Sequence, residues 1–359
     1  MKSLKYLFLV LILILSMAAC TDKTLGPIFF TLKTERSLVA DRGLEDEMTI
    51  HEIAKVGTRY FAAGNTLYTR TETGNWTTVS PPVSGALCNT IEIFGGNLYA
   101  GFFTVGGTGL GLYRTDPDII DWGNSPIPDS KVQNIQIGLV KAAGGNLYVS
   151  TVEQNGVAYD YYLYESTDGD SYTGITFDGT SPITFPIIDV EDDTTSLWIT
   201  AGPFLYLGTP AAIKQGAVDD PVGSGGKPLG GLLYSASLAQ LYVSGKDGKL
   251  WMWDTATWSS ESVTDAPSFT KFVDLDPVVG INGDIFVGTQ GEGYYRLIGG
   301  DQTNYERRPE YNISALYNGA INSLFLDISV TPDALFACTY SAGLWRADYV
   351  GGEWLWVQE

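Results

Sequence analysis

Apolar and polar residues alternate in short runs along most of this chain, and the runs come in pairs joined by glycine-rich turns. The clearest pair occupies residues 95–101 and 109–115. Each arm alternates apolar residues with small or polar ones, as a β-strand with one buried face does. Glycine and asparagine in the turns tolerate the positive φ angles that tight connections need. The pattern therefore predicts a β-hairpin.

The same pair of arms recurs seven times. The second arms end on aromatic residues spaced 45, 51, 42, 45, 44 and 50 residues apart, namely Tyr68, Tyr113, Tyr164, Tyr206, Trp251, Tyr295 and Trp345. The first arms also carry an aromatic residue at a matching position: Phe61, Tyr99, Tyr148, Trp198, Tyr242, Phe286 and Phe336. Aromatic residues at a fixed place in each repeat are expected to pack one repeat on the next.

The length of the repeat predicts the fold. Residues 49–359 contain seven copies of about 45 residues, which is the length of a four-stranded propeller blade. Helical periodicity is missing beyond the N-terminal segment, and 42 Gly and 16 Pro suit a turn-rich all-β chain. We therefore predict an all-β, seven-bladed β-propeller of four-stranded antiparallel blades. Its inner strands are predicted at 49–56, 87–94, 132–140, 183–190, 228–234, 269–273 and 321–330.

Residues 1–20 resemble a bacterial lipoprotein signal peptide. Lys2 and Lys5 precede an apolar run at 6–15, and small residues then lead to Cys20. The resemblance implies export and acylation of Cys20, by palmitate among other chains, and hence a lipid anchor in the bacterial membrane. An uncleaved anchor or an ordinary secretory signal is the alternative. Residues 21–48 are predicted to be a tether whose apolar run, 28–32, adds an extra strand or remains part of the tether.

The charge balance narrows the classes of partner. The formal net charge is −20, and the only adjacent cations are Arg307 and Arg308. Such a chain repels nucleic acid, and we predict that it binds none. The acidity serves solubility alone or, as the alternative, favours cationic partners and divalent metals. A monomeric propeller is predicted.

Two cysteines remain after Cys20. Cys88 falls on a predicted inner strand and Cys338 on the second strand of the last copy, in blades separated by the first. This separation exceeds the reach of a disulfide. Both are predicted to be free, buried residues.

Motifs for metals and catalysis fail when each residue is compared with the pattern. His51-Glu52 begins like a zinc-protease helix, but Lys55 stands where the second histidine is needed and His51 is the only histidine. The acidic stretches 116–121 and 189–193 are calcium candidates that chance also explains in so acidic a chain. We predict no metal, no cofactor and no catalytic residue.

One further resemblance concerns the turn 166–172, with the sequence Ser-Thr-Asp-Gly-Asp-Ser-Tyr, and more faintly 72–76. Both resemble degenerate Asp-boxes of sialidase-like (BNR) propellers. The resemblance implies a folding role, in which the Asp and Ser bind turn amides and the aromatic residue packs beneath. Sialidase activity also needs an Arg-Ile-Pro motif, which this chain lacks.

Polar residues near the starts of the predicted inner strands form the candidate site. In register they are His51, Asn89, Asn134, Lys271 and Asn322. Their amides and single ammonium suit a glycan or a peptide carboxylate, whereas the alternative is that they hydrate the channel or cap strand ends. The predicted function is a lipid-anchored, cell-envelope binding or scaffold protein for a protein, peptide or glycan. The alternative is an envelope glycosidase or polysaccharide lyase that uses carboxylates of the central cleft.

The lipid anchor is directly testable. Replacing Cys20 by Ser is expected to release a soluble or uncleaved form from membranes, because the acylated sulfur is lost. Metabolic labelling with a palmitate analogue measures the modification. Equal labelling of wild type and Cys20→Ser would contradict the prediction.

Overall fold

A computed structural model describes residues 42–44, 47, 49–123, 125–192, 195–210, 212–215, 228–245, 248–254, 258–262, 278–279, 283–291, 293–308, 316 and 319–359. All of them belong to one compact unit, 41–359. Cys20, the apolar run 28–32 and Lys271 lie outside the described residues. Within the described ranges, no helix has the length and apolar character that crossing a membrane requires.

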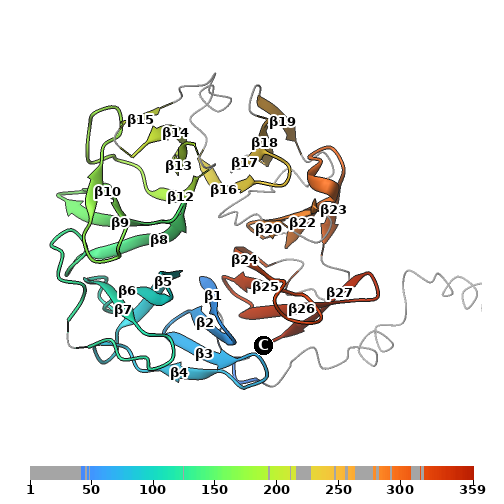
Figure 1. Cartoon of the computed structure of the whole chain (residues 1–359), viewed down its shortest axis with the longest axis horizontal. Helices are drawn as coiled ribbons and strands as arrows, with labels where there is room; N and C mark the ends of the chain where they lie inside the picture. The colour runs from blue at the N-terminus through green and yellow to red at the C-terminus, as the bar shows by residue number, and fades with distance from the viewer. Residues whose placement is uncertain are drawn as a thin grey trace, which may run out of the picture. The chain divides into compact units, whose positions relative to one another are not determined.

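The described chain forms seven antiparallel sheets, which follow one another in sequence order around a common centre (Figure 1). Their first strands are β1 (Glu52–Val56), β5 (Leu87–Phe94), β8 (Gln136–Ala143), β12 (Ile187–Asp192), β16 (Leu229–Ser235), β20 (Val278–Val279) and β24 (Ile321–Asp327). The second strands are β2 (Arg59–Ala63), β6 (Asn97–Phe103), β9 (Asn146–Asn155), β13 (Leu197–Ala201), β17 (Gln240–Gly245), β21 (Ile285–Gly288) and β25 (Ala334–Thr339).

The third strands are β3 (Leu67–Thr71), β7 (Gly109–Thr115), β10 (Ala158–Ser166), β14 (Phe204–Thr209), β18 (Lys249–Trp253), β22 (Tyr294–Leu297) and β26 (Leu344–Val350). The fourth strands are β4 (Thr77–Val79), β11 (Thr173–Ile175), β15 (Ala212–Gln215), β19 (Trp258–Ser262), β23 (Tyr305–Arg308) and β27 (Glu353–Gln358), and a short 3-10 turn, η3 (Ile298–Gly300), precedes β23. Each sheet pairs its strands in chain order, so the paired arms of every repeat are hairpins, as predicted.

The second sheet departs from the prediction of four strands, because only β5, β6 and β7 form it among the described residues. Instead of a fourth strand, an irregular segment lies along the edge of β7, where the Leu112 N–H donates to the Val132 carbonyl and the Ile127 N–H to the Leu112 carbonyl. Gly111, at φ +99°, permits this approach, since a Cβ there would meet the Val132 oxygen at 2.6 Å. The segment is rich in proline, which cannot donate to a strand ladder.

The predicted sixth inner strand, 269–273, lies outside the described residues. The described strand that pairs with β21 is β20, through Val278 and Phe286. A short apolar run has no feature that identifies it as a strand without knowledge of the hairpin beside it. The other predicted inner strands agree with β1, β5, β8, β12, β16 and β24 within a few residues.

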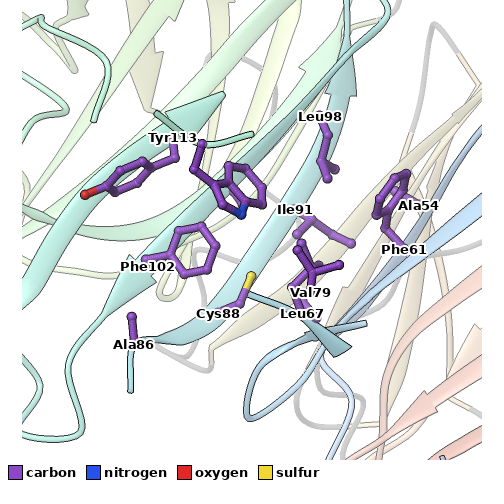
Figure 2. Close-up of a cluster of buried hydrophobic side chains, with 13 residues drawn as sticks. Ala54, Phe61, Leu67, Val79, Ala86, Cys88, Ile91, Leu98, Phe102 and Tyr113 are labelled. Carbon is purple, nitrogen blue, oxygen red and sulfur yellow. The ribbon is translucent and has the colours of Figure 1, made fainter. Parts of the chain in front are cut away.

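Hydrophobic clusters lie between successive sheets. Figure 2 shows the cluster between the first two, in which Phe61, Leu67 and Val79 face Ile91 and Leu98. The aromatic residue repeated in the second strand occupies the same place in each repeat and is buried in all seven: Phe61, Tyr99, Tyr148, Trp198, Tyr242, Phe286 and Phe336. Each packs with residues of the sheet that follows, so the repeat aromatics join the sheets as predicted.

Both described cysteines are free and buried, as the sequence predicts. Cys88 packs in the cluster between the first two sheets, and Cys338 in the cluster between the last sheet and the first. Burial raises the pKa of the Cys88 thiol above its ordinary value. Both therefore act as small apolar residues.

The turn between β10 and β11 is held by side chains. Asp168 Oδ1 accepts hydrogen bonds from the backbone N–H groups of Asp170 and Ser171, at 2.8 and 2.9 Å, and from the Ser166 hydroxyl, at 3.0 Å. Tyr172 is buried beneath the turn. Asp168 and Ser166 thus have a folding role in this turn.

Polar contacts join the last sheet to the first. Asp327, at the end of β24, accepts hydrogen bonds from the Lys55 ammonium at 2.7 Å and from the Tyr60 hydroxyl. Burial opposes ionisation of Asp327, but these bonds and those from Ser329 hold its pKa below the ordinary value. On the backbone, the Ile50 N–H donates to the Thr339 carbonyl at 3.0 Å.

A second contact between these sheets is a buried charge pair. Glu359 follows β27 and has no exposed surface, and its Oε2 lies 3.2 Å from Nε of Arg70, which is 2% exposed. The Trp76 indole donates to the same oxygen at 3.0 Å. Burial lowers the pKa of Arg70 to about 10, although the Glu359 carboxylate opposes this shift. An arginine so enclosed depends on its carboxylate partner.

Removing the charge of Glu359 is therefore expected to destabilise the protein strongly. Glu359→Gln keeps the size of the side chain but leaves the guanidinium of Arg70 buried without a counter-charge, which costs about 3 to 5 kcal/mol of unfolding free energy. Urea unfolding measures the loss. Glu353→Gln, on the exposed part of the same strand, is the matched control and is expected to change stability by less than about 0.5 kcal/mol. Equal stabilities of the two variants would contradict the prediction.

Candidate functional site

A cavity of about 740 Å³ runs along the inner strands. Residues of β1, β5, β8, β12, β16 and β24 line it, and so do four residues of the β9–β10 hairpin, Ser150, Val152, Tyr159 and Tyr161. The cavity lies where the first strands of the sheets come together. Most repeats therefore contribute side chains of their first strand to its lining.

The structure brings together three of the five predicted site residues. His51, Asn89 and Asn322 line the cavity. Asn134 is exposed, lies outside the lining and has a φ of 56°, and Lys271 is not among the described residues. The site therefore holds the amides of two predicted asparagines and the single imidazole of the chain.

The two lining asparagines also join neighbouring inner strands. Asn89 Nδ2 donates to the carbonyl of Ile137 at 2.7 Å, and Asn322 Nδ2 donates to the carbonyl of Ile50 at 2.7 Å. Each bond crosses from one sheet to the next. These side chains thus hold the wall of the cavity in place while bordering it.

Carboxylates of the inner strands make the same kind of bond, which the sequence analysis missed. Glu52 Oε2 accepts from the Ile91 N–H at 2.7 Å, Glu92 Oε2 from the Ala142 N–H at 3.0 Å, and Asp189 Oδ2 from the Leu232 N–H at 2.8 Å. All three carboxylates line the cavity. Neighbouring inner strands do not ladder with one another, so a carboxylate satisfies a strand N–H that faces the next sheet. The recurrence of an acidic residue on the predicted inner strands is the sequence signal that could have indicated these bonds.

Glu52 differs from an ordinary surface glutamate in its protonation. Burial raises its pKa to about 8, and the nearby Glu92 carboxylate adds to the rise. The hydrogen bonds from the Ile91 N–H and the Thr90 hydroxyl favour the ionised form but offset only part of the effect. At neutral pH the Glu52 carboxyl is therefore mostly protonated.

The cations of the cavity are bound to carboxylates of the chain. Lys55 Nζ lies 2.7 Å from Asp327 and 2.7 Å from Glu72, and Lys141 Nζ lies 3.8 Å from Asp189 Oδ1. Within the described part of the chain, no group of three or more His, Cys, Asp and Glu side chains is placed to hold a metal ion. The lining mixes apolar and polar side chains, and its lysines are engaged by carboxylates of the protein.

The β9–β10 hairpin extends the wall of the cavity. Pairing of β8 with β9 begins at Gln136 and Val152, whereas β9 continues to Asn155. Just before β8, Asn134 has a positive φ, and Val132 bonds to Leu112 of β7 rather than to β9. Tyr159 pairs with Gln154 on this projecting part, and Tyr161 pairs with Val152 at its base. The hairpin thus adds two tyrosines to a site built mainly from inner strands.

Comparisons with solved structures show the fold. The extracellular domain of BT4673 from B. thetaiotaomicron is similar with a TM-score of 0.61 and 15% identity, over 83% of this chain and 38% of that one. YCF48 bound to D1 peptide is similar with a TM-score of 0.60 and 15% identity, over 84% of this chain and 94% of that one. YCF48 from Cyanidioschyzon merolae has a TM-score of 0.59 and 11% identity, over 84% and 96%.

These likenesses identify a β-propeller fold, and at such low identity they show the fold alone. The chain spans well under half of the BT4673 domain that it matches. No family model and no curated protein matches the sequence.

The raised pKa of Glu52 predicts how stability depends on pH. A carboxyl that stays protonated up to about pH 8 in the folded state but ionises near pH 4.5 when unfolded stabilises the fold at low pH. This contribution is lost progressively as the pH rises between these two values. Glu52→Gln is expected to raise the melting temperature at pH 8 relative to wild type and to change it little at pH 4. Thermal unfolding across this range measures the effect. If the melting temperatures of wild type and Glu52→Gln changed with pH in the same way, Glu52 would not be the source of the pH dependence.

Proposed function

We propose that this chain is an exported, lipid-anchored binding protein of the bacterial envelope that binds a polypeptide at the cavity along its inner strands. In this proposal the seven sheets close into a seven-bladed propeller, Cys20 carries the anchor, and residues 21–48 tether the propeller to the membrane. His51, Asn89 and Asn322 face the ligand, and Asn134 and Lys271 complete the ring. The observation that carries the proposal is a cavity bordered by amides from several repeats and by two tyrosines of the β9–β10 hairpin.

The bonding of the carboxylates favours binding over catalysis. Glu52, Glu92 and Asp189 each accept a backbone N–H of the neighbouring inner strand. Each of these carboxyl groups thus has one oxygen engaged in holding two neighbouring sheets together. The polar groups of the cavity thus support a site that is rigid, as a binding site requires.

The solved structures support a polypeptide ligand. YCF48, which shares the fold over most of its own length, has been solved with a bound D1 peptide. The BT4673 domain is extracellular, in agreement with an exported propeller. Amide groups of asparagine suit the backbone of a peptide, since each offers a donor and an acceptor.

A polysaccharide-cleaving enzyme is the second candidate, and Glu52 is the observation that favours it. A carboxyl group that is protonated at neutral pH and borders a cavity meets the first requirement for a general acid. Release of new reducing ends from envelope polysaccharides by wild type, and not by Glu52→Gln, would favour this candidate over the binding protein.

The proposed function is tested by probing peptide and glycan arrays with the purified protein. Gln136 is exposed at the start of β8 and lines the cavity, so Gln136→Trp fills part of the site without breaking a bond between sheets. The variant is expected to bind the peptide spots at least about tenfold more weakly than wild type, because bulk displaces the ligand from a preformed site.

The matched control is Ile328→Trp, since Ile328 is exposed and follows the end of an inner strand, at the other end of the sheets. Unfolding curves verify that both variants are folded. Binding to glycan spots alone would overturn the polypeptide ligand. Undiminished peptide binding by Gln136→Trp would place the site outside the cavity.

A further inference from the structure

The β9–β10 hairpin projects beyond the inner strand beside it and leaves part of a strand edge open. Pairing of β8 with β9 begins at Gln136, opposite Val152, whereas β9 continues through residues 153–155. The chain before β8 lies against β7 instead, where the Leu112 N–H donates to the Val132 carbonyl. Residues 153–155 are exposed, and among the described strands they pair with β10 alone. A sheet edge of this kind can accept a further strand.

The backbone groups of Gln154 face this open edge. On the other side of the hairpin, Tyr161 exchanges backbone hydrogen bonds of 2.9 and 3.0 Å with Ile183, so its N–H and C=O point away from β9. In an antiparallel pair the opposite residue then points its groups away as well, and this orientation repeats at every second residue. Val152 stands opposite Tyr161, and Gln154 is two residues further along β9. The Gln154 N–H and C=O therefore face the open edge, where no described residue bonds to them.

One face of the projecting part belongs to the cavity. Val152, Tyr159 and Tyr161 all line the cavity. Gln154 shares this face, because it lies directly opposite Tyr159 in the hairpin. Tyr159 is 49% exposed. A strand added at the open edge would direct every second side chain toward these residues, where apolar and aromatic side chains fit.

The other face of the projecting part is acidic. Glu153 stands directly opposite Asp160, and like charges in such positions destabilise a strand pair. Asp160 accepts a hydrogen bond from the Asn155 amide at 2.9 Å, but within the described ranges neither carboxylate has a salt bridge. Burial raises the pKa of Tyr162 on this face, and both carboxylates add to the rise. A Lys or Arg side chain beside Glu153 would neutralise this pair of charges.

We infer that a partner polypeptide binds as an added β-strand at the open edge of β9, with its backbone bonded to Gln154, basic side chains beside Glu153 and apolar side chains directed to the cavity. This inference rests on the proposed function and names the binding mode and the side-chain pattern of its polypeptide. In strand addition the backbone bonds supply affinity, whereas the alternating side chains supply specificity. The net charge of −20 attracts a basic segment over longer distances.

The inference is tested by selecting phage-displayed random linear peptides on the immobilised full chain. The enriched peptides are expected to carry Lys or Arg at every second position and apolar residues between them. Gln154→Pro removes the N–H that faces the edge and breaks no bond to β10, since that N–H points away from β10. It is expected to weaken binding of the selected peptides at least about tenfold, because the new strand pair loses a backbone hydrogen bond and the proline ring obstructs its approach.

The matched control is Gln154→Ala, which removes the side chain but keeps the N–H, and it is expected to change binding by less than about twofold. A second variant, Glu153→Lys, leaves the backbone intact. It is expected to weaken binding at least about threefold at low salt and less at high salt, because it turns an attraction into a screened repulsion. Unfolding curves verify that all three variants are folded.

Selected peptides that bind Gln154→Pro as tightly as Gln154→Ala would overturn the added strand. If Gln136→Trp still reduced their binding, the proposed function would stand without it. Peptides that lack alternate basic residues, or whose binding ignores Glu153→Lys, would overturn the side-chain pattern. Selection of no peptide beyond those that an uncoated surface retains would overturn the proposed function itself.

Discussion

One buried aromatic side chain per repeat packs each sheet against the next. A strand of five residues has too little area to bury by itself, and a four-stranded sheet with two open faces must cover both of them. The aromatic residue repeated in the second strands packs against the next sheet, from Phe61 to Phe336, which packs against the first. The burial of every sheet therefore depends on its two neighbours. The positions of the turns and of the cavity depend on the same contacts between sheets.

Burial of that kind leaves the inner strands with unpaired backbone groups. Successive inner strands lie side by side without a ladder, and the protein supplies carboxylates and amides from the strands themselves as partners. The same side chains border the cavity, so the groups that set its polarity are also those that fix its width. This dual role explains why Glu52 sits in an environment that disfavours its charge: its place is determined by the Ile91 N–H rather than by solvent.

The sequence predicted the hairpins and their aromatic residues because both follow from a local pattern repeated seven times. It failed where long-range pairing decides the outcome. Among the described residues the second sheet has no fourth strand, since a proline-rich segment covers β7, and the first strand of the sixth sheet is identified by its pairing with Phe286. At the site, register placed His51, Asn89 and Asn322 together, but Asn134 leaves the strand at a positive φ, a backbone feature that side-chain patterns do not reveal.

Each described sheet is built from one continuous stretch of chain, with no strand borrowed from another repeat. The contact between the last sheet and the first therefore consists of side chains and single backbone bonds, of which the Asp327 and Glu359 groups are the most polar. Each sequence repeat therefore corresponds to one sheet. Duplication or loss of one repeat during evolution would thus change the number of sheets without changing the pairing of any other strand.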